Sequence, residues 1–165
     1  MELLGVKYLL EHKEREQPDR PASMRFPADL FAVAWEDDSW RIWEYKKVLP
    51  RAFFVPSYMY ESTDQSIVNR LYDPATDLRN TVVLEDRPIL PIPQCCVEFS
   101  NASVSIMRYE PETVELTVEA NRDGFVFLSD TYDPGWKASV DGNPTNIHRA
   151  NFAFRAVEVP TGSHT

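Results

Sequence analysis

Residues 125–159 read FVFLSDTYDPGWKASVDGNPTNIHRANFAFRAVEV, and this stretch decides the fold class. Its apolar runs are separated by turn signals at 133–136 (Asp-Pro-Gly-Trp), 141–142 (Asp-Gly) and 149–151 (Arg-Ala-Asn). In the first signal, proline pre-sets φ at the second turn position and glycine suits the positive φ that a type II turn needs at the third. Asp-Gly is a preferred connection of a tight hairpin, because both central residues take φ > 0. The stretch therefore predicts an antiparallel meander.

The last apolar run of this stretch changes its parity. Phe152 and Phe154 fall on one side of an ideal strand, whereas Val157 and Val159 fall on the other, since side chains alternate along a strand. One extra residue between the two pairs would reconcile them. We therefore predict a β-bulge near residues 155–156, and an unbroken ladder from 154 to 159 would contradict it.

The remaining chain predicts hairpins, one helix and a connector. Apolar and polar residues alternate at 103–108 and 114–119 around a turn, and a second hairpin is expected where 31–35 and 40–45 flank an acidic turn. Residues 63–71 have helical spacing, with Ser62 or Thr63 as the N-cap. The segment 86–96 is interrupted by prolines at 88, 91 and 93, each of which removes an amide donor.

These elements predict a mainly β fold, an antiparallel β-sandwich with a small α+β N-terminal portion. We expect that portion at residues 1–93 and the antiparallel β portion at 94–165, with the option that the two pack as one domain. The composition agrees with a globular protein, because 43% of the 165 residues are hydrophobic and 12% are aromatic.

Charge and hydropathy exclude several classes of protein. The formal net charge is −9, from 17 basic and 26 acidic residues, so nucleic acid is not an expected partner. No segment approaches the roughly 18 to 20 apolar residues that span a bilayer, and the first residues, MELLGVKYLLEHKERE, are too charged for a signal peptide. The chain as given is expected to be soluble.

Cys95 and Cys96 are adjacent and are the only cysteines. A disulfide between neighbours closes a small strained ring, so we interpret them as two thiols, one facing inwards and one outwards. His12, His148 and His164 have no paired spacing that indicates a metal ligand set. The sequence also lacks a phosphate-binding glycine loop and a nucleophile elbow, so no metal and no cofactor are expected.

Two sets of residues are candidates for glycan chemistry. Asp130, Asp133 and Asp141 could form the carboxylate pair of a glycosidase, but two of them precede Pro or Gly in turns, where aspartate has a conformational role. We therefore assign no catalytic residue. Tyr132 and Trp136 flank the Pro-Gly turn and are the candidate binding residues, because such aromatics stack on sugar rings; the competing interpretation is that Trp136 packs in the core.

The C-terminal motifs resemble one family. The sequence SDTYDPGWKASVDGNP at 129–144, followed by NFAFRAVEVPTGSHT at 151–165, is similar to the end of the extracytoplasmic domain of YfhO-like bacterial membrane proteins. Shorter segments resemble the same family at 49–53 (Leu-Pro-Arg-Ala-Phe), at the start of the chain and at 77–85. The segment from 11 to 26 and the cysteine pair have no counterpart in this resemblance.

The resemblance implies a function that the residues alone do not. YfhO-like proteins are multi-pass glycosyltransferases of the GT-C type, whose catalytic acidic residue is expected among the membrane helices and whose sugar donor is lipid-linked. The chain would then be a non-catalytic domain on the extracytoplasmic face of the bacterial cytoplasmic membrane, inactive alone and supporting glycan or acceptor binding. Its partners would be the membrane helices of the parent protein and a glycan or cell-envelope polymer. The family continues into a further strand and a membrane helix, so a missing last strand is expected.

Two alternatives stay open from the sequence. The chain could be a free-standing carbohydrate-binding or adhesion module, or a purely structural domain that stabilises its membrane partner. Flanking sequence with apolar segments would favour the first interpretation over the free-standing module. Glycan binding compared with a Trp136→Ala variant would separate the binding roles from the structural one.

Overall fold

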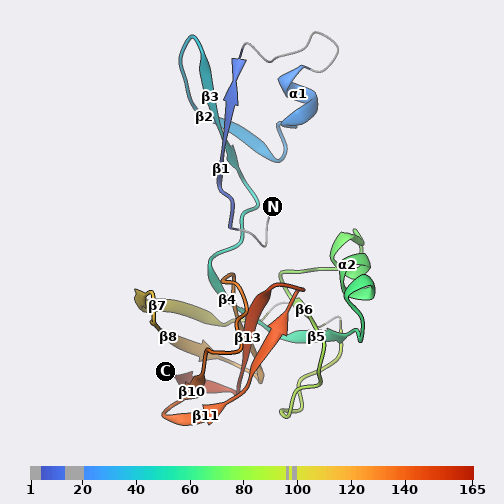
Figure 1. Cartoon of the computed structure of the whole chain (residues 1–165), viewed down its shortest axis with the longest axis vertical. Coiled ribbons are helices and arrows are strands. Elements are labelled where there is room, and N and C mark those ends of the chain that lie inside the picture. The colour runs from blue at the N-terminus through green and yellow to red at the C-terminus, as the bar shows by residue number, and fades with distance from the viewer. Residues whose placement is uncertain (1–4, 14–20, 96, 98–99) are drawn as a thin grey trace. The chain divides into compact units, whose positions relative to one another are not determined.

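The structure is a computed structural model that describes residues 5–13, 21–95, 97 and 100–165. The chain divides into two compact units, Met1–Pro50 and Arg51–Thr165 (Figure 1). Each unit has its own strands and its own buried side chains. The two units are therefore described separately.

The first unit is a three-stranded antiparallel sheet with one short helix. It contains β1 (Tyr8–His12), α1 (Ala22–Arg25), β2 (Phe31–Glu36) and β3 (Trp40–Tyr45), in the sheet order β1-β3-β2. The predicted hairpin over 31–45 is confirmed. Its core consists of Ala22, Phe31, Trp43 and Tyr45.

A buried carboxylate ties this small core together. Glu11 on β1 is 5% exposed, and its Oε2 accepts a hydrogen bond from Trp43 Nε1 at 2.7 Å. The same carboxylate pairs with Arg25 of α1 and with Arg41 Nη1 at 3.5 Å. Because buried charges need such partners, Glu11 acts as a structural link between helix and sheet.

The second unit contains the remaining strands and the longer helix. In chain order these are β4 (Ala52–Val55), β5 (Ser57–Tyr60), α2 (Asp64–Tyr72), β6 (Thr81–Leu84), β7 (Ser103–Glu110), β8 (Thr113–Ala120), β9 (Gly124–Leu128), β10 (Ala138–Val140), β11 (Asn143–Thr145), β12 (Ile147–Ala150), β13 (Phe154–Val159) and β14 (Gly162–His164). They form a six-stranded sheet (β4-β9-β13-β12-β6-β5), a three-stranded sheet (β14-β8-β7) and the hairpin β10-β11.

The two larger sheets share one apolar core. Val118 and Ala120 of the three-stranded sheet pack with Phe54, Val126 and Val159 of the six-stranded sheet, and all five are at most 9% exposed. Because both sheets bury a face in this cluster, the predicted sandwich of a mainly β protein is confirmed. The six-stranded sheet takes strands from both sides of residue 93. It also contains one parallel pair, β5 with β6.

The helix α2 begins where its capping residue predicts. Thr63 has an extended backbone, and its Oγ1 accepts a hydrogen bond from the backbone N–H of Ser66 at 3.2 Å. This satisfies one amide of the first helical turn, as an N-cap threonine does. Ile67 is 1% exposed and anchors the helix on the unit. The N-cap prediction is confirmed for Thr63.

The predicted β-bulge near residues 155–156 is wrong. β13 pairs with β12 and with β9 in an unbroken register from residue 154 to 159. Phe152 is outside the strand, in a turn where Asn151 and Phe152 have φ of 47° and 73°, whereas Phe154 lies in β13 on the face opposite Val157 and Val159. Both faces of β13 are covered, so its apolar residues need not share one parity.

Of the two turns predicted at 133–136 and 141–142, the structure confirms only the second. Gly135 is not among the residues with positive φ, so the predicted type II turn at 133–136 is wrong. Asp133 Oδ1 accepts the Gly135 N–H at 2.7 Å and the Trp136 N–H bonds to the Asp133 carbonyl at 3.2 Å, an arrangement that Asp followed by Pro also favours. Asp141 and Gly142 both have positive φ, at 52° and 79°, which confirms the tight hairpin β10-β11.

The interpretation of the cysteines as two thiols is wrong for Cys95. This residue is disulfide-bonded. The expectation of one inward and one outward side chain assumed an extended backbone, whereas Cys95 has φ of 58° in the left-handed region. Cys96 lies outside the described residues.

Candidate functional site

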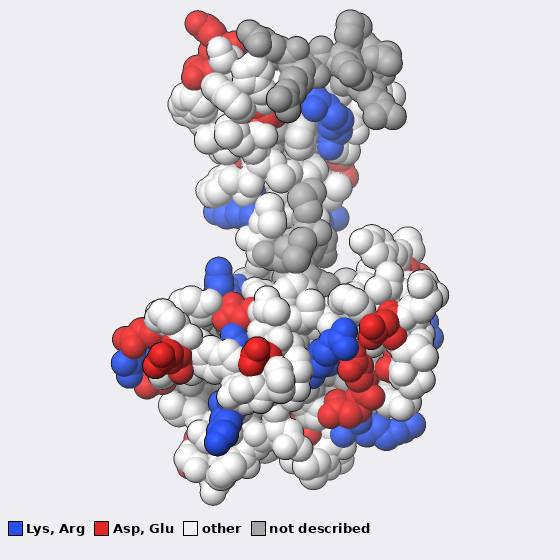
Figure 2. Space-filling view, in the orientation of Figure 1, with Lys and Arg blue, Asp and Glu red and all other residues white. Residues whose placement is uncertain are grey.

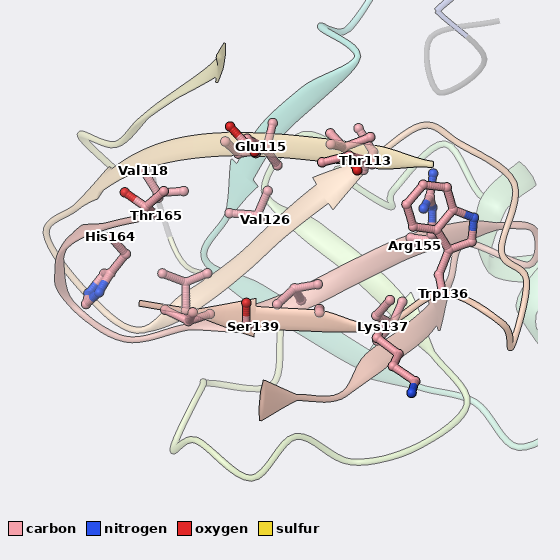
Figure 3. A pocket seen from close by; sticks show the side chains of 18 of the residues that line it. Thr113, Glu115, Val118, Val126, Trp136, Lys137, Ser139, Arg155, His164 and Thr165 are labelled. Carbon is pink, nitrogen blue, oxygen red and sulfur yellow. The ribbon is translucent and has the colours of Figure 1, made fainter. Parts of the chain in front are cut away.

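A cleft of about 1000 Å³ lies in the second unit, beside the sandwich core. β8 forms one wall, β9 and β13 form the floor, and β10 with the turn that follows it lies along the other side (Figure 3). Its volume falls within the usual range of ligand sites, about 300 to 1000 Å³. The lining side chains that are aliphatic are Val114, Leu116, Val118, Val126, Leu128, Ala138, Val140, Ile147, Val157 and Val159.

Trp136 and Arg155 lie against each other at one end of the cleft (Figure 3). The guanidinium carbon of Arg155 is 4.4 Å from the centre of the Trp136 ring, within the range of a cation–π contact. Arg155 is 6% exposed, and its Nε has no hydrogen-bond partner within the described part of the chain. Trp136 is half-buried, so part of the indole stays accessible.

Asp130 neutralises this buried cation. Arg155 Nη2 donates to Asp130 Oδ2 at 2.8 Å, and Arg51 Nη1 donates to Asp130 Oδ1 at 2.8 Å. The Tyr109 hydroxyl completes the set, because it lies 3.0 Å from each carboxylate oxygen and accepts from Arg51 at 2.7 Å. One carboxylate thus joins side chains from β7, β13 and the segment that precedes β4.

The opposite end of the cleft is bridged by the last residues. Figure 3 places His164 and Thr165 there, away from Trp136. Asp141 donates its N–H to the Thr165 carbonyl at 2.8 Å and accepts the Thr165 N–H at 2.9 Å. Asp141 Oδ2 also lies 2.7 Å from His164 Nδ1, and this bond raises the pKa of His164 and lowers the pKa of Asp141.

The three candidate aspartates do not assemble into a pair. Asp130 is held by two arginines, Asp133 accepts the Gly135 amide, and Asp141 lies at the other end of the cleft with His164. A glycosidase needs two carboxylates facing one bond, at about 5 to 10 Å. Each carboxylate here has a local partner that explains its position.

The structure separates the two predicted binding residues. Trp136 lines the cleft, whereas Tyr132 is half-buried and is not one of its lining residues. The Tyr132 N–H donates to the Ala153 carbonyl at 2.8 Å, which places it beside the turn before β13. Of the two candidate binding residues, Trp136 is therefore the one that lies at the cleft.

Sequence reasoning missed Arg155, Arg51 and Tyr109 as parts of this site. One signal was present for Arg155, because a cation within the apolar run FAFRAV must find a buried partner. Arg51 and Asp130 both lie in segments that carry the family resemblance, at 49–53 and 129–144. Their meeting depends on pairing of strands far apart in the chain, and no local pattern predicts it.

A second buried polar cluster lies away from the cleft. His148 is 2% exposed, with Nδ1 at 2.7 Å from Asp86 Oδ1 and Nε2 at 2.9 Å from Glu158 Oε1. The Glu158 carboxylate also accepts the backbone N–H groups of Ile89 and Leu90. The cluster fastens the proline-rich segment to β12 and β13.

Charged side chains are mixed over the face of the second unit drawn in Figure 2, where basic groups lie beside acidic ones. Among the ion pairs of this unit, Arg149 Nη1 lies 2.7 Å from Glu85 Oε1, and Arg70 Nε lies 2.8 Å from Glu61 Oε1. Within the described residues, no group of three or more His, Cys, Asp or Glu side chains could hold a metal ion.

The decisive comparison concerns the part of the chain that contains the cleft. Residues 91–165 match the family model of the bacterial membrane protein YfhO. The resemblance drawn from the C-terminal motifs is thereby confirmed over this range, which includes every residue that lines the cleft. No curated protein and no solved structure matches the chain.

The YfhO match indicates a domain of a bacterial membrane protein. In the portion of the chain that the structure describes, no helix is both long enough and apolar enough to cross a bilayer. Among its described residues, the YfhO-matching segment contains the strands β7 to β14.

Proposed function

We propose that the second unit is a non-catalytic, extracytoplasmic domain of a YfhO-type multi-pass membrane glycosyltransferase, and that it binds the glycan or acceptor on which the parent protein acts. The membrane helices of that parent and a glycan or cell-envelope polymer are its partners. The observation that carries this proposal is the half-buried Trp136 at one end of a ligand-sized cleft inside the YfhO-matching range.

The electrostatics of the site support a binding role over catalysis. Asp130 accepts hydrogen bonds from Arg51, Arg155 and Tyr109, so its oxygens are already engaged. A general acid or base needs a free proton position near the substrate. Arg155, held by Asp130, supports one side of the Trp136 ring and fixes the indole as a stacking surface.

Binding of soluble oligosaccharides to the 165-residue chain tests this role. Glucose, galactose and N-acetylglucosamine oligomers are titrated by calorimetry into the wild-type chain and into a Trp136→Ala variant. We expect at least one oligomer to bind and the variant to lose about tenfold in affinity, which corresponds to about 1.4 kcal/mol.

The matched control is Tyr72→Ala, which removes an aromatic side chain that is 84% exposed on α2, away from the cleft. This variant should bind like the wild type. Equal binding by the wild type and Trp136→Ala would contradict the proposal and favour a purely structural domain.

A further inference from the structure

The cleft between its two ends is lined mainly by aliphatic side chains, with Glu115 and Ser139 as the polar residues that Figure 3 labels along its length. Val114, Leu116 and Val118 line one wall from β8, and Val126 and Val159, at 4% and 3% exposure, lie on the floor. Among the described residues, the only lining side chain with a buried and unpartnered polar atom is Arg155, at the Trp136 end.

This lining discriminates between classes of ligand. A sugar placed in the interior would exchange water hydrogen bonds for aliphatic contacts, an exchange that disfavours each buried hydroxyl. A hydrocarbon chain placed there gains affinity with every methylene removed from water. The interior therefore suits an aliphatic chain, whereas the indole at the end suits a sugar.

We propose that the cleft binds the tail of a single-chain amphiphile whose sugar head lies on Trp136. This inference rests on the proposed function and names its ligand class. From Thr113 to Val118 the β8 wall extends roughly 17 Å, at the strand rise of about 3.4 Å per residue. Thr113 lies near Trp136 and Val118 near His164 in Figure 3, so the wall runs from one end of the cleft to the other.

The orientation of the ligand follows from the two ends. Hydrogen bonds between Asp141 and Thr165 bridge the His164 end. The opposite end carries the half-buried indole and the guanidinium of Arg155. The tail therefore points towards His164, and the head lies at Trp136.

A chain-length series tests the proposal on the complete 165-residue chain. Octyl, decyl and dodecyl maltoside are titrated below their critical micelle concentrations, with maltose as the ligand without a tail. We expect the affinity to rise roughly three- to fourfold per methylene, or about tenfold for each pair. An affinity independent of tail length would overturn the proposal.

A variant that fills the cleft provides the structural control. Ala138 lies on the same face of β10 as Val140, which packs against the sandwich core, so Ala138→Phe places a ring in the cleft. We expect this variant to lose the dependence on tail length, and Ser105→Phe, at an exposed position of β7 outside the cleft, to retain it. Retention in both variants, or loss in both, would overturn the proposal. Val140→Phe replaces Ala138→Phe if thermal unfolding shows that the latter does not fold.

The same titrations separate this inference from the proposed function. If Trp136→Ala removes the difference between dodecyl maltoside and dodecanol while tail-length dependence persists, both statements are supported. Tail-length dependence without any contribution from the sugar contradicts the proposed function and the position of the head on Trp136, and supports only the tail site in the cleft. Sugar binding that depends on Trp136 but not on tail length contradicts the further inference only.

Discussion

The guanidinium carbon of Arg155 lies 4.4 Å from the centre of the Trp136 ring, and the same guanidinium donates to Asp130 at 2.8 Å. The position of the indole therefore depends on a buried ion pair behind it. Residues from β13, from the turn before β10 and from the segment that follows β9 meet at this point. This relationship links the stability of the sandwich to the shape of the cleft.

Removing Asp130 should destabilise the second unit strongly. The Arg155 and Asp130 side chains are 7% and 12% exposed, so Asp130→Ala leaves a buried cation without its carboxylate. Breaking such a pair costs about 3 to 5 kcal/mol, and we expect a loss of this size in the free energy of unfolding, measured with urea.

The double variant Asp130→Ala/Arg155→Met should recover much of that loss, because it removes the unpaired charge. Glu61→Ala is the control, since it breaks a more exposed pair with Arg70 and should cost less than about 1 kcal/mol. A loss of similar size for Glu61→Ala and Asp130→Ala would show that the buried Asp130–Arg155 pair stabilises the unit no more than an exposed ion pair does.

Gly124 is required for packing and not for a positive φ. A Cβ at this position would lie 2.3 Å from Phe54 Cζ and 2.8 Å from the Val55 carbonyl oxygen. We expect Gly124→Ala to lower the free energy of unfolding by about 1 to 3 kcal/mol through overpacking.

A second substitution distinguishes this cause from backbone strain. Phe54→Leu should reduce the penalty of Gly124→Ala, because it removes the nearest clashing atoms. It should not reduce the penalty of Gly142→Ala, where φ is 79° and no atom lies within 4 Å of the added Cβ. Full additivity of Phe54→Leu with Gly124→Ala would refute the packing explanation.

Glu158 should control the attachment of the proline-rich segment. Its carboxylate accepts the Ile89 N–H at 3.0 and 2.9 Å and the Leu90 N–H at 2.7 Å. Glu158→Met keeps a similar length without an acceptor, so we expect faster hydrogen exchange at both amides, measured by mass spectrometry or NMR. Asp86→Asn, at a side chain that is 60% exposed, should have a smaller effect. Unchanged exchange in Glu158→Met would contradict this assignment.

The contact between His164 and Asp141 should make the attachment of β14 depend on pH. The hydrogen bond to Asp141 raises the pKa of His164 above its ordinary 6.5, so its stabilising effect is full below pH 6.5 and is lost as the pH rises through the higher value. The pKa of Asp141 is lowered from 3.8, mainly by His164, so its contribution is present above that pH and is lost on acidification.

The thermal unfolding midpoints of the wild type and His164→Gln test this dependence. We expect the difference between them to be larger at pH 5.5 than at pH 9. The difference should also shrink at acidic pH, where Asp141 becomes protonated. An equal or larger difference at pH 9 would mean that the pair does not stabilise β14 through the charged imidazole.

Local patterns predicted the elements of this fold better than their assembly. The hairpin at Asp141 and Gly142 and the cap at Thr63 follow from the conformations that these residues favour, and both are confirmed. The bulge was wrong because β13 buries residues on both faces, such as Ala156 on one and Val159 on the other, so its apolar residues need not share one parity. The presence of Gly135 suggested a type II turn, but the Asp133 side chain stabilises a different one.

The site could be predicted only in part for the same reason. Trp136 was found because an aromatic beside a tight turn is visible in the sequence. Its support by Arg155, and the junction of Arg51, Tyr109 and Asp130, join residues separated by up to 79 positions. Such contacts depend on the order of strands in two sheets, which local spacing does not determine.

The indole N–H signals of the chain give the most direct test of the central claim, that a glycan lies on Trp136. The chain has four tryptophans, and Trp35, Trp40 and Trp43 all belong to the first unit. In a ¹H–¹⁵N spectrum during titration with an oligosaccharide, the signal of Trp136 should shift in proportion to binding while the other three stay in place. Shifts confined to the first unit, or a bound oligosaccharide that leaves the Trp136 signal unmoved, would contradict a glycan site at the cleft.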